Sequence, residues 1–133
     1  MRVHPICAFD DNYIWAIETN TSHGVIIVAP GEATPVFEWL KENNKTITAI
    51  FVTHHHYDHT GGIADLTKKY SCPVIGPHNP EIKTITQAVQ EGERFSMAGV
   101  DWEVIETPGH TLDHISFYTP GFLFCGDTLF SGG

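Results

Sequence analysis

Short apolar runs separated by turn residues dominate the chain, and this pattern predicts a strand-rich fold. Turn signals such as Ala29-Pro30-Gly31 and Thr119-Pro120-Gly121 end several of these runs. The predicted strands are residues 3–9, 13–18, 25–28, 48–53, 73–76, 94–97, 100–107, 114–118 and 122–126.

Two stretches have helical rather than strand periodicity. Residues 32–42 place Val36, Phe37 and Leu40 on one face, and residues 63–70 end in Lys68-Lys69, which suits a helix C-terminus. The stretch 77–90, with two prolines and several threonines, is predicted to be mostly loop. We therefore expect an α+β sheet sandwich with helices outside, formed by residues 1–133 as one domain.

Composition limits the possible binding partners and the expected cellular location. The formal charge is −9, which disfavours nucleic acid, and the chain has neither a run long enough to span a membrane nor a signal peptide. Cys7, Cys72 and Cys125 are widely spaced without a Cys-x-x-Cys, so we expect small buried thiols in a reducing compartment. Cytoplasm is the expected location.

The segment Thr53-His54-His55-His56-Tyr57-Asp58-His59 gathers metal-ligand types directly after a predicted strand. On extended chain His54 and His56 point the same way, whereas Asp58 and His59 can reach a second ion nearby. An internal, interrupted cluster does not resemble a purification tag, and a structural zinc site normally brings cysteines. An open metal site at a sheet edge is the better interpretation.

Two further metal-ligand types follow strand ends elsewhere in the chain. His110 lies in Thr107-Pro108-Gly109-His110-Thr111, and Asp127 lies in Cys125-Gly126-Asp127-Thr128. Each alone is typical of a turn. Together with the histidine cluster they place ligand types at three separate strand ends, which favours one shared metal centre.

These motifs resemble the signature of the metallo-β-lactamase superfamily. Within it, the segments 9–15, 53–56 and 124–133 are similar to the glyoxalase II family, the hydroxyacylglutathione hydrolases. The N-terminal Asp11-Asn12-Tyr13-Ile14-Trp15 is the most specific of them, because most other branches lack it. The resemblance implies an αββα sandwich of which this chain matches only the N-terminal portion, without the helical substrate domain.

The resemblance also implies a ligand set. The first metal takes His54, His56 and His110, the second takes Asp58 and His59, and Asp127 bridges both. One more family histidine lies beyond residue 133. Two divalent ions are expected, zinc first with iron or manganese as alternatives, because all three accept imidazole and carboxylate.

The implied reaction is hydrolysis of a glutathione thioester, S-D-lactoylglutathione, to glutathione and a 2-hydroxy acid. Two ions on the order of 3.5–4 Å apart share a water and make the hydroxide that attacks the thioester. A thiolate, with a pKa near ~8.5, leaves without a general acid. The alternatives are a non-catalytic metal-binding fragment, or another hydrolase or a sulfur dioxygenase of the same superfamily.

Three features depart from the family pattern. Ala29 stands where the family has an aspartate that orients a metal ligand, and Asp113 stands where it has a glycine. Residues 131–133 end the chain just after Asp127, in a segment expected to be loop. Weakened metal affinity and low activity of the chain alone are therefore expected.

Overall fold

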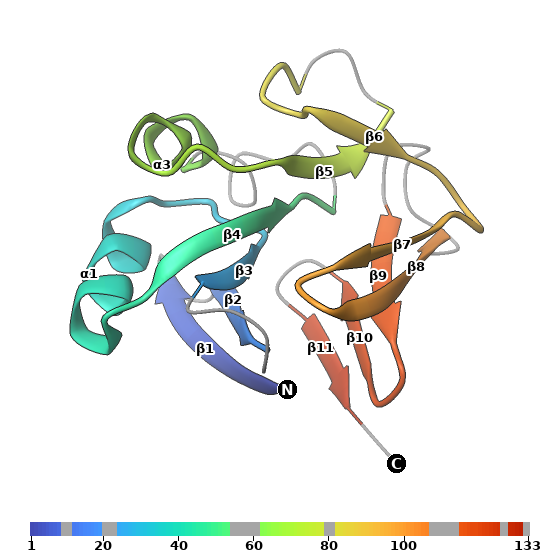
Figure 1. Ribbon diagram of the computed structural model, residues 1–133, viewed down its shortest axis with the longest axis horizontal. Helices are drawn as coiled ribbons and strands as arrows, with labels where there is room; N and C mark the ends of the chain where they lie inside the picture. The colour runs from blue at the N-terminus through green and yellow to red at the C-terminus, as the bar shows by residue number, and fades with distance from the viewer. Residues whose placement is uncertain are drawn as a thin grey trace.

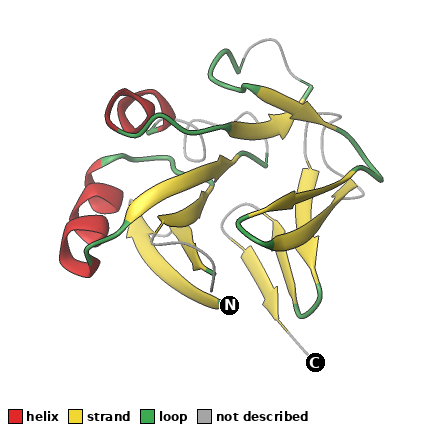
Figure 2. Ribbon diagram, viewed as in Figure 1, coloured by secondary structure: helices red, strands yellow, loops and turns green. Residues whose placement is uncertain are grey.

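Two β-sheets face each other in the computed structural model, which describes residues 1–8, 12–19, 24–53, 62–78, 82–106, 115–125 and 128–131 (Figure 1). Both described helices lie on the outer side of the first sheet (Figure 2). This confirms the predicted sandwich of sheets with helices outside. Within the described residues, no helix is long and apolar enough to span a membrane.

The first sheet has six strands in chain order. The first three strands are antiparallel, and the last four run parallel to one another. The helices supply two of the crossovers that parallel neighbours require. The elements are β1 (Arg2–Ala8), β2 (Asn12–Glu18), β3 (Gly24–Val28), α1 (Thr34–Asn43), β4 (Thr46–Phe51), α3 (Ile63–Lys69), β5 (Val74–Pro77) and β6 (Gln87–Val89).

The second sheet is antiparallel, with strands in the order β11-β10-β9-β8-β7. Its connections within β7–β8 and β9–β10 are short turns, as expected for a meander. The elements are β7 (Arg94–Met97), β8 (Val100–Glu106), β9 (Ile115–Thr119), β10 (Phe122–Cys125) and β11 (Thr128–Ser131).

Alternating side chains divide the core into two layers. Ile27 and Ile50 point toward the helices, where they meet Val36, Leu40 and Leu66. The opposite face of the same strands fills the space between the sheets, so β3 is buried along its whole length.

Phe51 is the centre of the layer between the sheets. Its ring stacks on Phe117 at 4.4 Å between centroids and meets Trp102 edge-on at 5.1 Å. Aromatic pairs of this kind add about 0.5–1.5 kcal/mol beyond their buried area. The ring cluster therefore joins β4 of the first sheet to β8 and β9 of the second.

Two strands were not predicted from the sequence. β6 lies within the stretch predicted as loop, and β11 includes Ser131, which was predicted to be in a loop. In β6 only Val89 is buried, so no apolar alternation marks it. Both are short strands that exist because a neighbour supplies backbone partners: β5 for β6 and β10 for β11.

The prediction of buried cysteines was wrong. Cys7 is exposed on the edge strand β1, while Cys72 and Cys125 are only half-buried. In β1 it is the neighbouring Ile6 that points into the core, and alternation turns Cys7 outward. Burial raises the pKa of the Cys72 thiol, which keeps that group protonated.

Candidate metal centre

The residues that flank the first two ligand motifs meet at one hydrogen bond. Thr53 immediately precedes residues 54–61, and Ile115 immediately follows residues 107–114. The backbone N–H of Ile115 donates to the carbonyl of Thr53 at 2.8 Å, and both residues are buried. This bond links β4 of one sheet to β9 of the other and brings the ends of the two loops together.

The third motif begins beside the second. Cys125 and Thr128, which flank Gly126-Asp127, face each other in the β10–β11 pair. The hydroxyl of Ser116 donates to Sγ of Cys125 at 3.1 Å, and Ser116 directly follows Ile115. Adjacent strands are about 4.8 Å apart, so the third loop starts within one or two strand spacings of the Thr53–Ile115 bond.

Both outer ends of these loops are also held. The backbone N–H of Gly62, just after residues 54–61, donates to the carbonyl of Pro30 at 2.9 Å. A Cβ on Gly62 would lie 2.6 Å from the carbonyl carbon of Glu32, so only glycine fits there. The backbone N–H of Glu106, just before residues 107–114, donates to the carboxylate of Glu91. We call this end of the sandwich, from the Ala29–Gly31 turn across Thr53 to Ile115 and Cys125, the rim.

Ala29 lies on the rim in an unusual conformation. Its φ is 59°, in the left-handed region that costs a residue with a Cβ about 1–2 kcal/mol. Its N–H donates to the carbonyl of Phe51 at 2.9 Å, and its methyl group is fully buried in the layer between the sheets. A methyl group offers no hydrogen bond, so position 29 gives no polar support to a ligand in this chain.

All six predicted ligands lie outside the described residues: His54, His56, Asp58, His59, His110 and Asp127. The same holds for Asp113. Among the residues that the structure does describe, no three metal-ligating side chains gather. The ligand set therefore stays a prediction, supported by the convergence of the strand ends on which the three motifs begin.

A sequence model of the metallo-beta-lactamase superfamily matches residues 9–133. The chain belongs to the metallo-beta-lactamase superfamily. The match includes all three ligand motifs.

Curated members of the superfamily are closely similar in sequence. The hydroxyacylglutathione hydrolase of Idiomarina loihiensis is 71% identical over 133 residues, which are 100% of this chain and 53% of that protein. The protein of the same name from Chromohalobacter salexigens is 54% identical over 136 residues, again 100% of this chain and 53% of its own length. The chain thus spans about half the length of these relatives.

Solved structures share the fold at low identity. ETHE1 from Myxococcus xanthus superposes with a TM-score of 0.78 at 24% identity, over 94% of this chain and 56% of that one. The BLEG-1 B3 metallo-beta-lactamase gives a TM-score of 0.82 at 22% identity, over 98% of this chain and 74% of that one. At these identities the likeness shows the metallo-beta-lactamase fold alone.

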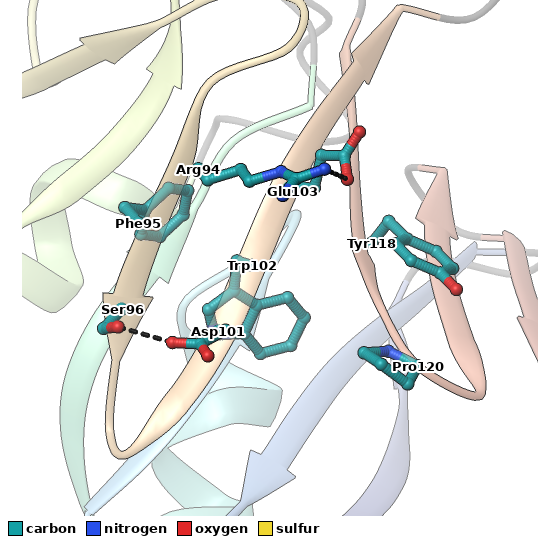
Figure 3. Close-up of a pocket in the computed structure, with 8 residues that line it drawn as sticks. All are labelled: Arg94, Phe95, Ser96, Asp101, Trp102, Glu103, Tyr118 and Pro120. Atoms are coloured by element: carbon teal, nitrogen blue, oxygen red, sulfur yellow. Dashed lines mark hydrogen bonds and ion pairs between the residues drawn. The ribbon is translucent and has the colours of Figure 1, made fainter.

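A groove of about 500 Å³ lies away from the rim, over β7, β8 and β9 (Figure 3). Its polar side chains pair with each other: Arg94 Nη2 is 3.4 Å from Glu103 Oε1, and the hydroxyl of Ser96 donates to Asp101 at 2.6 Å. Tyr118 and Pro120 form its other side. With its charges already matched and no histidine or cysteine among its described lining residues, the groove does not suit the chemistry of the superfamily.

Sequence reasoning gave no role to two aromatic residues beside the rim. Tyr13 and Trp15 of β2 stack with their ring centroids 5.6 Å apart. The signal that could have found them was already visible, because both belong to the specific N-terminal motif 11–15.

Proposed function

We propose that the chain is a metal-dependent thioester hydrolase that converts S-(2-hydroxyacyl)glutathione, with S-D-lactoylglutathione foremost, into glutathione and a 2-hydroxy acid. The observation that carries the proposal is the hydrogen bond from Ile115 to Thr53, which joins two motif-bearing loops that lie far apart in sequence. The substrate class comes from the hydroxyacylglutathione hydrolases that match the whole chain.

The residues of the three motifs fit a pair of divalent ions. Imidazole and carboxylate suit zinc, iron and manganese alike, and the strand ends that carry them converge. The proposed ligands are His54, His56 and His110 for the first ion, Asp58 and His59 for the second, and Asp127 for both.

When bound, such ions lower the pKa of a water toward neutrality and polarise the thioester carbonyl. The chain itself orients the ligand loops, since Thr53, Gly62, Glu106 and Ile115 hold their ends. Beneath the rim, the rings around Phe51 fill the layer between the sheets and keep water out of it. No side chain has to protonate the leaving thiolate, whose pKa is near ~8.5.

A second candidate function is metal binding with little hydrolysis, and Ala29 favours it. Loss of a polar group that supports a metal ligand typically costs about 10–100-fold in metal affinity or activity. The buried methyl group of Ala29 provides no such support. Metal content and turnover, measured together, separate the two functions.

The test is to load the purified chain with zinc, iron and manganese in turn, and to measure metal per chain and thiol release from S-D-lactoylglutathione. We expect the wild type to bind metal, and His110→Ala to lose metal and at least about 100-fold in rate. His78→Ala is the matched control, since His78 is exposed at the end of β5 and outside the motifs. Equal metal content in His110→Ala and the wild type would contradict the ligand assignment. Metal binding without thiol release would leave the second candidate function.

A further inference from the structure

Tyr13 lies at the rim, on the same side of the first sheet as the interior of the sandwich. Trp15 pairs with Val28, and Val28 pairs with Phe51, so these three side chains share the face between the sheets. Tyr13 is two residues nearer the rim than Trp15, and Thr53 is two residues beyond Phe51. Extending the register of these pairs by two residues puts Tyr13 level with Thr53, two strand spacings or about 10 Å away.

The position leaves the Tyr13 ring open to solvent. Of the described large apolar and aromatic side chains, two are exposed, Tyr13 at 44% and Tyr118 at 38%. Tyr118 belongs to the groove on the far side of the second sheet. Tyr13 instead stands beside the strand end that leads into the histidine motif, with one ring face stacked on Trp15.

Trp15 provides a second, independent observation. Its indole Nε1 is buried and has no hydrogen-bond partner among the residues that the structure describes. His4 Nε2 is the other described side-chain atom in this state, but it lies 3.4 Å from a carboxylate oxygen of Glu18. Buried unpaired donors are uncommon and gather at functional sites, where a cost to stability is tolerated.

We propose that Tyr13, held in place by Trp15, is a specificity-determining residue that packs against the peptide part of a glutathione thioester. The inference rests on the proposed function. Distance favours the peptide, because Tyr13 is about 10 Å from Thr53, the residue that precedes the histidine motif, and a two- or three-carbon acyl group bound there is too short to reach Tyr13. Glutathione is attached through the thiol of its central cysteine, and the cysteine side chain together with the γ-glutamyl arm, at about 3.3–3.6 Å per backbone residue, covers that gap. Trp15 acts as a positioning residue.

The kinetic test compares two thioesters on the metal-loaded chain: S-D-lactoylglutathione, and S-lactoylcysteamine, which lacks the peptide. We expect Tyr13→Ala to raise KM for the glutathione thioester about tenfold, the size of one aromatic contact, while kcat changes little. KM for the cysteamine thioester stays unchanged. Tyr13→Phe keeps the ring and stays within about twofold of wild type. Tyr118→Ala, which removes the matched exposed tyrosine, leaves KM unchanged for both thioesters.

A binding readout keeps the inference testable if turnover is absent. The indole N–H resonance of Trp15, assigned with Trp15→Phe, is followed by NMR while glutathione or cysteamine is added. Glutathione should shift this resonance and cysteamine should not. The inference is overturned if the folded Tyr13→Ala variant has an unchanged KM for the glutathione thioester, or if glutathione does not shift the Trp15 indole resonance. Either outcome leaves the hydrolase proposal intact. Absence of thiol release from both thioesters counts against the hydrolase, and the NMR titration then decides the role of Tyr13.

Discussion

The rim and the groove over β7–β9 differ in how their polar groups are satisfied. In the groove, Arg94 and Ser96 face Glu103 and Asp101 across the β7–β8 pair, so each charge or hydroxyl already has a partner within the sheet. At the rim, backbone bonds such as the one from Ile115 to Thr53 fix the residues that flank the ligand motifs. The polar side chains of the groove are thus already paired, whereas the strand ends at the rim lead into the segments that carry the metal-ligand types.

A second difference is steric. The rim is crowded at the backbone level, where Gly62 lies against Glu32 and Ala33. The turn before β7 is open, and a Cβ at Gly92 would meet nothing within 4 Å. Substitutions at the rim should therefore lower the free energy of unfolding or the metal affinity more than substitutions around the groove.

Gly62→Ala should be the most damaging change. Its Cβ would press on backbone atoms of Glu32 and Ala33 at 2.6 and 2.7 Å, which cannot move without displacing the start of α1. We expect the free energy of unfolding to fall by about 3 kcal/mol, with loss of metal binding. Gly92→Ala, at φ 84°, should cost only about 1–2 kcal/mol from backbone strain. Urea denaturation of both variants measures the difference, and equal losses would refute a crowded rim.

Glu91→Ala should weaken metal binding without unfolding the protein. Its carboxylate accepts the N–H of Glu106 at the start of the loop that carries His110. Groups that orient a ligand from outside the metal shell typically change affinity about 10-fold or more. Ser96→Ala removes a comparable exposed hydrogen bond in the groove and should leave metal affinity unchanged. Competition with a chromogenic zinc chelator measures the zinc affinity of both variants. An equal loss of affinity in both would contradict the difference between the rim and the groove.

Ala98→Asn should stabilise the chain. Ala98 and Gly99 have φ values of 55° and 76°, the left-handed pair that a tight hairpin turn between β7 and β8 requires. Asparagine tolerates that conformation better than alanine, so a gain of about 0.5–1 kcal/mol is expected. Thermal melting should show a higher midpoint with unchanged metal content. A lower midpoint would mean that the half-buried Ala98 methyl group contributes more than the strain costs.

Glu18→Gln should have the smallest effect and a defined pH dependence. Burial opposes ionisation of Glu18, but the nearby His4 imidazole and the charge of Lys45 outweigh it, so the pKa of Glu18 is lowered from 4.5. A lowered folded-state pKa stabilises the fold above the unfolded value, and this contribution disappears as the pH falls through the folded value. We expect a loss of about 0.5 kcal/mol at neutral pH and a smaller loss near pH 3. Urea melts at both pH values measure this, and an equal loss at both would assign the effect to packing.

Much of the architecture could be predicted from periodicity. The fully apolar run at Val25–Val28 marked a strand covered on both faces, and Val36 with Leu40 marked the helix that covers one of them. β6 and β11 could not be predicted in this way, because β6 has a single buried side chain and β11 depends on pairing with β10. The periodicity of apolar residues predicts which face of an element is buried. It cannot predict a strand that forms only because a neighbouring strand offers backbone hydrogen bonds.

The features of the candidate site also separate into those that the sequence predicts and those that depend on the tertiary structure. The sequence by itself determined which residue types are available: imidazoles and carboxylates directly after three predicted strands, and an aromatic pair at 13 and 15. Only the tertiary structure decided that Thr53 meets Ile115, that Ser116 meets Cys125, and that Tyr13 is level with them while Tyr118 is not. The physical reason is that ligand chemistry is a property of single side chains, whereas convergence depends on sheet register and on the packing around Phe51, which join segments distant in sequence.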